Sequence, residues 1–215
     1  MTRFNPTRPA LSRERILSEA LALIESDGLD AFSTRRLAQR LGCEAMSLYH
    51  HHPSKAHLLD SLVDQVLGAM PLPDPSQRPA DRLRQLAATW RHMARRHPRF
   101  YLWLALHRWN SATGVRFLGA VLGCFADAGL SREQSARAFR VVGYYLLGAT
   151  LDETGGYAQG PSSLNPIPLD VLQREHPLVA QAGEFFVPEQ FDRTFELGFE
   201  VLLRGLGLDS GTSPD

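Results

Sequence analysis

The stretch from Ser33 to Lys55, STRRLAQRLGCEAMSLYHHHPSK, constrains the fold of this chain more than any other. Ser33 is a suitable N-cap for a short helix, because its hydroxyl can accept a hydrogen bond from an unpaired N–H at the helix start. Gly42 suits the left-handed conformation that ends a helix, and Pro53 disfavours helix in the residue before it. The stretch therefore predicts two short helices joined by a tight turn.

The second of these helices, about Ala45 to His51, is expected to bury Leu48. Its other faces would then carry Ala45, Met46, Ser47, Tyr49, His50 and His51. A glycine turn followed by a short helix with polar and aromatic side chains outward is typical of a helix-turn-helix, whose second helix enters a major groove. The alternative is a pair of ordinary bundle helices that bind no nucleic acid.

The flanking sequence favours the first interpretation. Leu11 to Asp27 has a helical spacing of apolar residues, with Ser12 as its cap and Gly28 at its end. Leu29 and Phe32, which precede the Ser33 cap, are expected to pack into the core. A supporting helix followed by a helix-turn-helix predicts a three-helix head.

Composition limits the remaining possibilities. The chain is 44% hydrophobic and 21% charged, which is an ordinary globular balance. Its zero formal net charge argues against a protein that coats nucleic acid without sequence preference. No run approaches the roughly 18–20 apolar residues of a membrane span, and the N-terminus lacks the apolar region of a secretory signal. The two cysteines, Cys43 and Cys124, make a disulfide framework improbable, so a cytoplasmic protein with no membrane partner is expected.

The rest of the chain is predicted to be helical, which gives an all-α fold. The proline-rich segment PLPDPSQRPAD (71–81) marks a boundary. We expect a DNA-binding domain at 1–53, a connecting helix at 54–70 and a helical body at 71–215. Residues 1–10 are expected to form a mobile arm and DSGTSPD a disordered tail.

Two late helices of the body have wide apolar surfaces. Ser131 and Gln134 form a capping box that opens the first, whose segment from Val141 to Leu151 is apolar nearly all round and should be covered on most sides. The second begins at Pro188. We expect these helices to form a two-fold bundle with a second copy, since a helix-turn-helix needs two heads to bind a palindrome. The expected contributors are Gly143, Tyr144, Phe195, Gly198, Phe199 and Leu202.

The head resembles the N-terminal domain of the tetracycline-repressor (TetR) family of bacterial regulators. The resemblance lies in the A…L…GL…F/ST…LA…LG frame and in SLYHHHPSKAHLL. More loosely, FADAGLSREQSARAFRVVGYYLLGATLDE resembles the C-terminal half of the tetracycline repressors. The resemblance implies a dimer through the two late helices and a phosphate contact by Lys55. The expected DNA-binding residues are Thr34, Arg35, Glu44, Ala45, Met46, Ser47, Tyr49, His50, His51 and Lys55.

The resemblance also implies a small-molecule pocket in the body. The residues expected to line it are Trp90, Met93, Trp103, His107, Phe117, Val121, Tyr144, Tyr145 and Asp152. Asp152 ends an apolar run, where a carboxylate is costly unless it is satisfied. In the tetracycline repressor the matching residue helps hold a metal that bridges to the drug. The two histidines of that site fall at about Pro71 and Ala105, so we expect an effector other than magnesium–tetracycline. No metal-ligating residue and no cofactor is assigned, and participation of a metal in effector binding stays open.

An enzyme is a poor match, because HExxH, GxSxG, a phosphate loop and CxxC are all absent from the sequence. We expect a DNA-binding regulator, a repressor that binds a palindromic operator as a homodimer and is released by a small-molecule effector. The alternative is a DNA-binding regulator controlled by a protein partner. The sequence names neither the effector nor the operator, and it leaves repression and activation open.

Overall fold

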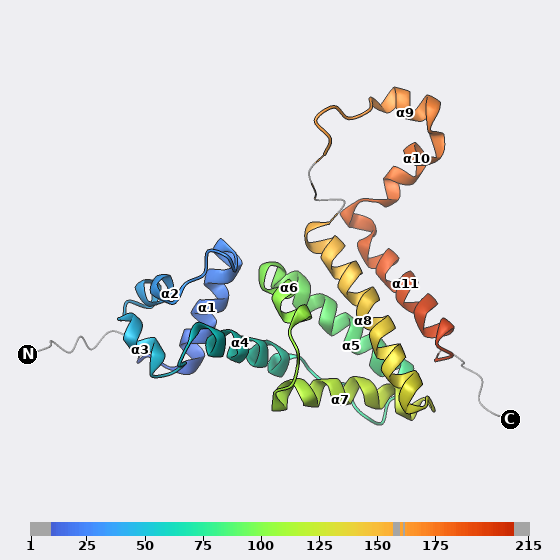
Figure 1. Ribbon diagram of the computed structural model, residues 1–215. Helices are drawn as coiled ribbons and strands as arrows, with labels where there is room; N and C mark the ends of the chain where they lie inside the picture. Colours follow the sequence, from blue (N-terminus) through green and yellow to red (C-terminus); the bar gives the residue numbers. More distant parts are fainter. Residues whose placement is uncertain (1–9, 157–159, 161, 209–215) are drawn as a thin grey trace, which may run out of the picture. The chain divides into compact units, whose positions relative to one another are not determined.

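The computed structural model describes residues 10–156, 160 and 162–208. These residues form helices and connecting loops with no strand, which confirms the predicted all-α fold. The predicted N-terminal arm, apart from residue 10, and the predicted C-terminal tail lie outside them. In chain order the helices are α1 (Arg13–Asp27), α2 (Thr34–Leu41), α3 (Ala45–Tyr49), α4 (Lys55–Ala69), α5 (Pro79–Arg96), α6 (Pro98–Leu106), α7 (Ala112–Asp127), α8 (Arg132–Gly155), α9 (Leu169–Glu175), α10 (Pro177–Ala182) and α11 (Phe191–Gly205) (Figure 1).

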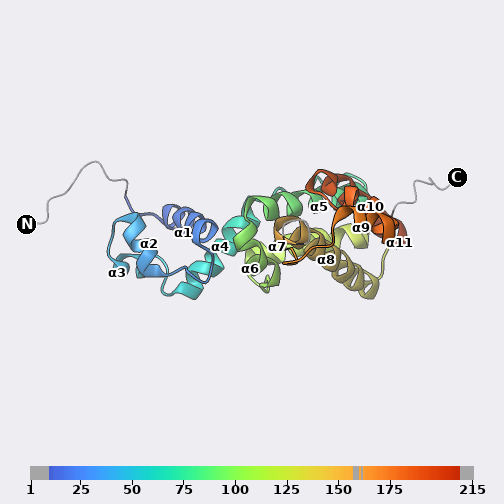
Figure 2. The same cartoon turned by 90° about the horizontal axis from the view of Figure 1, so that it is seen from above.

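The chain divides into two compact units. We call Met1–Ala69 with Arg99–Gly114 the head unit, and Met70–Pro98 with Val115–Asp215 the body unit. The head unit therefore contains nearly all of α6 as well as α1 to α4. Both views show α1, α2 and α3 grouped together (Figure 1, Figure 2).

The core of the head unit is formed by one face from each of four helices. The side chains that are nearly inaccessible to solvent are Ile16, Ala20, Ile24, Leu37, Leu41, Leu48, Leu58 and Leu62. The predicted caps are present: the Ser12 hydroxyl accepts from the Arg15 amide, and the Ser33 hydroxyl accepts from the Arg36 amide. Gly42 has φ 65°, the left-handed conformation predicted for the turn. The helix ends are thus fixed locally, and the buried faces hold the helices together.

In the body unit, α5, α8 and α11 pack together. Ser131 and Gln134 form the predicted capping box at the start of α8. Tyr145 of α8 donates a hydrogen bond to the Phe195 carbonyl of α11 at 2.6 Å. A Cβ at Gly198 would lie only 2.5 Å from the Tyr145 hydroxyl, so a side chain there would displace the tyrosine ring.

One expectation about the body needs correction, and two further features leave apolar surface exposed in the single chain. Pro188 begins a 3₁₀ turn (Pro188–Gln190), and α11 starts only at Phe191. Val141, Tyr144 and Leu151 of α8 are exposed, so the described residues of one chain do not cover this segment on most sides. The short helices α9 and α10 contain no buried residue. Apolar surface is therefore left over on α8 and along α9 and α10.

None of the described helices is by itself long and apolar enough to cross a membrane. Among the described helices, α7 and α8 taken together have the length and apolar composition of a membrane span, but the pair is bent by 120° between the two helices.

Candidate DNA-binding surface and ligand-binding sites

The helix-turn-helix of the head unit comprises α2, the turn at Gly42 and α3. Leu48 anchors α3 because its side chain is 1% exposed. None of the ten predicted DNA-binding residues is buried, and Met46 is 66% exposed on the outer face of α3. An exposed thioether beside Ala45 and Ser47 offers apolar contact and one hydroxyl, which suits thymine methyl groups and a single polar base edge. The α3 helix is shorter than predicted and ends at Tyr49, so His50 and His51 lie in the following turn.

The three arginines of α2 differ in their partners. Arg36 forms an ion pair with Asp27, and Arg40 pairs with Glu19 at 2.8 Å. Arg35 is exposed and has no ion pair or hydrogen bond within the part of the chain that the structure describes. Its guanidinium is therefore the one of the three that is available for a phosphate, the usual partner of arginine at a DNA surface.

Three further predicted residues are held in place by contacts within the head. The Lys55 ammonium donates to the Phe32 carbonyl at 2.9 Å and lies 5.4 Å from the centre of the Phe32 ring. The Tyr49 and Thr34 hydroxyls lie 3.3 Å apart, which connects α3 to the start of α2. These contacts restrict the motion of the side chains before any DNA is bound.

His52 is a residue that the sequence reasoning missed. It is 4% exposed, and its Nδ1 lies 3.3 Å from the Ser61 hydroxyl of α4. Burial lowers the pKa of His52, and the positive charges of Arg13, His51 and His57 lower it further. The His52 amide donates to the Leu48 carbonyl at 2.8 Å, so the turn after α3 keeps His52 on the face of Leu48, as the four-residue spacing in the sequence indicates. It links the end of the helix-turn-helix to α4.

The nine predicted ligand-binding residues are divided between the two units. Trp103 and His107 belong to the head unit, where their rings are 5.8 Å apart and they line one pocket. In the body unit Trp90, Met93, Phe117 and Val121 are buried, and Tyr145 is half-buried. Burial raises the pKa of the Tyr145 hydroxyl, and this hydroxyl donates its hydrogen bond to the Phe195 carbonyl.

Tyr144 and Asp152 are placed differently from the prediction. Tyr144 is 61% exposed, with the Arg140 guanidinium 4.7 Å from its ring centre. Asp152 is exposed, and the buried carboxylate at the end of α8 is that of Glu153. One residue turns a helix by about 100°, so Glu153 takes the inner face and Asp152 the outer one. Thr150, three residues before Glu153, is also buried and lies on the same face of α8.

Glu153 is the centre of an ion network in the body unit. The Arg91 Nε donates to both Glu153 oxygens at 2.9 Å, and the Arg95 Nε donates to one of them at 3.0 Å. Asp192 of α11 accepts from both arginines at 2.8 and 2.9 Å, and hydrogen bonding by Arg95 is the main cause that lowers the pKa of Asp192. The Arg91 guanidinium also lies 4.3 Å from the centre of the Phe195 ring. The network thus joins α5, α8 and α11.

The six predicted dimer residues are not on one surface. Phe195 and Phe199 are buried in the body unit with their rings 5.6 and 6.1 Å from that of Tyr145, and Gly198 faces the same tyrosine. Leu202 is half-buried, whereas Gly143 and Tyr144 are exposed. The outward apolar side chains of the two helices include Val141, Tyr144, Leu197 and Val201. Val141, Tyr144, Leu197 and Val201 are therefore better placed to contact a second copy than the six predicted residues.

Within the described residues, no group of three or more His, Cys, Asp or Glu side chains is arranged to hold a metal ion.

Two family models match the sequence. Residues 16–62 match the model described as bacterial regulatory proteins, tetR family, and residues 72–208 match the tetracyclin repressor-like C-terminal domain. The chain is 30% identical over 214 residues to an HTH-type transcriptional regulator of Saccharopolyspora erythraea, covering 95% of this chain and 88% of that one. It is 29% identical over 208 residues to the tetracycline repressor protein class E of Escherichia coli, covering 91% and 90%.

Solved structures give the same result. A possible TetR family transcriptional regulator from Streptomyces coelicolor A3(2) matches with a TM-score of 0.73 and 25% identity, covering 91% of this chain and 98% of that one. The Streptomyces coelicolor TetR family protein ActR in complex with actinorhodin matches with a TM-score of 0.70 and 25% identity, covering 95% and 100%. The fold and the sequence therefore indicate the same family over nearly the whole chain.

Proposed function

Because the chain belongs to the TetR family and is a DNA-binding transcriptional regulator, we propose that it is a repressor that binds a palindromic operator as a homodimer and is released by a small-molecule effector. The observation that carries the proposal is the head unit. Its α3 helix is anchored by Leu48 and presents Ala45, Met46 and Ser47 outward. A helix held in this way is suited to insertion into a major groove.

In the proposed complex, phosphate contacts come from α2 and from the start of α4. Arg35 is the arginine of α2 without a partner in the described residues, and Lys55 lies at the first residue of α4. A helix N-terminus attracts anions because its amides are unpaired. Base edges are contacted by α3, with Met46 and Ala45 against thymine methyl groups and with Ser47 and His50 as the polar groups. Glu44, Tyr49, Thr34 and His51 complete the surface.

Replacement of Arg35 by alanine tests this docking. Affinity should fall for all DNA sequences alike, and the slope of log K against log salt should decrease by about one unit, since one phosphate contact is lost. Lys55→Ala should have the same effect. Binding is measured by fluorescence anisotropy at several salt concentrations.

Arg36→Ala is the matched control, because Arg36 is already paired with Asp27. Its salt slope should stay at the wild-type value. An unchanged slope in Arg35→Ala and in Lys55→Ala would show that the head docks by another surface.

A homodimer is supported by apolar surface that one chain leaves exposed. Tyr144 on α8 and Leu197 and Val201 on α11 are 61%, 62% and 57% exposed. The segment around α9 and α10 adds Leu164, Leu178 and Phe185, which are more than half exposed. Exposed apolar side chains gathered on neighbouring helices are typical of interaction surfaces. The partner that a two-fold operator requires is a second copy.

An effector is supported by the ligand complexes of ActR, whose structures contain actinorhodin and (S)-DNPA. For this chain we propose a partly apolar effector contacted by aromatic residues of the body unit, namely Trp90 of α5, Phe117 of α7 and Tyr145 of α8. It differs from magnesium–tetracycline, since Pro71 and Ala105 stand where histidines are expected and Asp152 is exposed. The effector acts by binding more tightly to the form of the dimer whose two α3 helices do not match half-sites about 34–36 Å apart.

Reciprocity gives the test of switching. Operator DNA should weaken effector binding by the same factor by which the effector weakens operator binding. Isothermal titration of a ligand found by thermal-shift screening, with and without operator, measures both factors. Equal effector affinities in the two titrations would mean that this ligand does not switch the protein and would favour control by a protein partner.

A further inference from the structure

A pocket of about 890 Å³ lies entirely within the head unit. Its lining comes from the α1–α2 connection, from α4 and from α6, and includes Leu29, Asp30, Asp60, Arg99, Trp103 and His107. The volume is in the range of drug-sized sites, and an aromatic wall with a few polar groups is the usual lining of such sites. The pocket is independent of the effector contacts proposed for the body unit.

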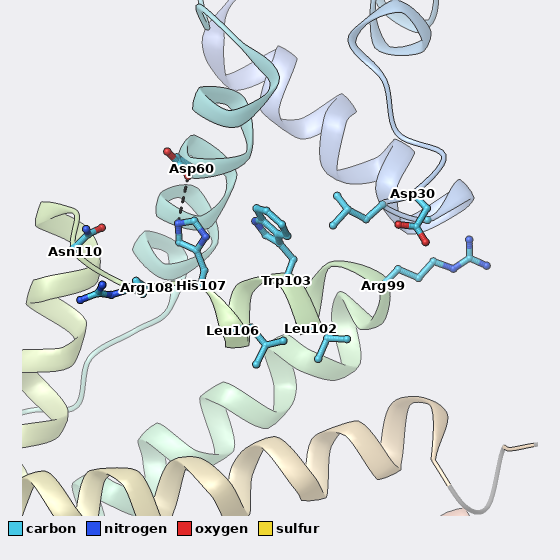
Figure 3. A pocket seen from close by; sticks show the side chains of 11 residues that line it. Asp30, Asp60, Arg99, Leu102, Trp103, Leu106, His107, Arg108 and Asn110 are labelled. Atoms are coloured by element: carbon cyan, nitrogen blue, oxygen red, sulfur yellow. Dashed lines mark ion pairs between the residues drawn. The ribbon is translucent and has the colours of Figure 1, made fainter.

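Trp103 provides a flat aromatic surface in this pocket. Its side chain is 36% exposed, and the ring of His107 is tilted against it at 38°. Figure 3 shows Trp103 between the Asp60–His107 pair and Asp30, whereas Leu102 and Leu106 leave α6 in another direction. The indole face is therefore open to a planar ligand and is flanked by carboxylates.

The two carboxylates are incompletely satisfied. Asp60 is 62% exposed and pairs with the His107 Nε2 at 3.3 Å, and Asp30 has no ion pair or hydrogen bond in the described ranges. Two arginines also line the pocket, and Figure 3 shows the Arg99 guanidinium on the Asp30 side. The Arg99 guanidinium donates to the Ser26 carbonyl, and Arg108 points away from Trp103 toward Asn110 (Figure 3). Neither arginine forms an ion pair with Asp30 or Asp60 in the described residues, so the indole has a carboxylate without an arginine partner on either side.

We propose that this pocket binds a planar aromatic cation. The ring system stacks on Trp103, and the positive charge lies between Asp60 and Asp30, which combines a cation–π contact with two carboxylates. Asp30 is three residues before Ser33, the cap of α2, and Asp60 lies five residues beyond Lys55 on α4. A ligand that contacts both residues connects the segments on either side of the helix-turn-helix. It therefore affects DNA affinity from within the DNA-binding unit.

The experiment uses the full chain without DNA, so that intercalation does not contribute and a failure of the proposed repressor function does not affect the result. The probes are 1-methylquinolinium, the neutral 1-methylnaphthalene and the anionic naphthalene-1-sulfonate. Isothermal titration should show that the cation binds best. Asp30→Asn and Asp60→Asn should each weaken cation binding about threefold to tenfold, the range for partly exposed charge contacts.

Asp170→Asn on α9 is the control and should bind the cation like the wild type, since Asp170 lies outside the pocket. Trp103→Leu should abolish binding of the cation and of the neutral probe, and melting temperatures establish that each variant is folded. Binding of the anion as tight as that of the cation, or full cation affinity in both aspartate variants, overturns the proposal.

Discussion

Glu153→Ala is expected to destabilise the body unit by about 3 kcal/mol, the lower end of the cost of breaking a buried ion pair. Glu153 is 8% exposed, and its removal leaves the buried Arg91 with Asp192 as its remaining carboxylate partner in the described network. The expected decrease in melting temperature is roughly 6–12 °C for a chain of this size. Circular dichroism on heating measures it.

A double variant distinguishes the destabilisation caused by an unpaired buried charge from the destabilisation caused by lost packing. Arg91→Met with Glu153→Leu replaces the pair by apolar groups, and its stability should lie much closer to the wild type than that of Glu153→Ala, because no buried charge is left alone. Arg137→Met on α8, at an exposed pair with Glu133, serves as the surface control and should change stability by less than about 1 kcal/mol. If Glu153→Ala melts like the wild type, the network is not needed for the packing of α5, α8 and α11.

Leu197→Arg combined with Val201→Arg is expected to convert the proposed homodimer into a monomer. Both side chains are more than half exposed in the single chain, so arginine costs the isolated fold little, whereas in an interface it places unpaired charge against apolar surface. Operator affinity should fall by about 10²–10⁴-fold, since the second head no longer binds at high effective concentration. Light scattering at micromolar concentration and anisotropy with operator DNA measure the two effects.

Val115→Arg is the control for added charge, because Val115 is also exposed but lies on α7. It should remain dimeric. A wild-type mass of 23.9 kDa in solution, that of one chain, would refute the interface. Gly198→Arg is an unsuitable test, because a side chain there meets Tyr145 of the same chain and disrupts the α8–α11 packing before any interface is formed.

The helix-turn-helix could be predicted from sequence almost to the residue. Ser12, Ser33 and the Ser131–Gln134 box act on amides three residues away, and Gly42 acts through its own backbone angles. Such signals depend only on residues a few positions apart, so the sequence is sufficient to predict them. The burial of Leu37, Leu41 and Leu48 follows from helical spacing in the same way.

The sites were predictable only in part. Helical spacing marks which residues share a face, but it leaves open whether that face meets another helix of the same chain, a second copy or a ligand. The apolar character of Phe195 and Phe199 predicts a dimer interface, whereas the structure packs both rings on Tyr145, which is 50 residues away from Phe195. Trp103 and His107 were grouped with the body aromatics, and the structure places them in the head unit.

By itself, then, the sequence determined the all-α fold, the capped helix starts at Ser12, Ser33 and Ser131 and the turn at Gly42, because each depends on contacts within a few positions of the chain. Tertiary structure decided that Glu153 rather than Asp152 is the buried carboxylate, since its partner Arg91 is 62 residues away. It also decided that Asp30, Asp60 and Trp103 line one pocket. Both outcomes depend on the packing of helices far apart in sequence, which no local pattern specifies.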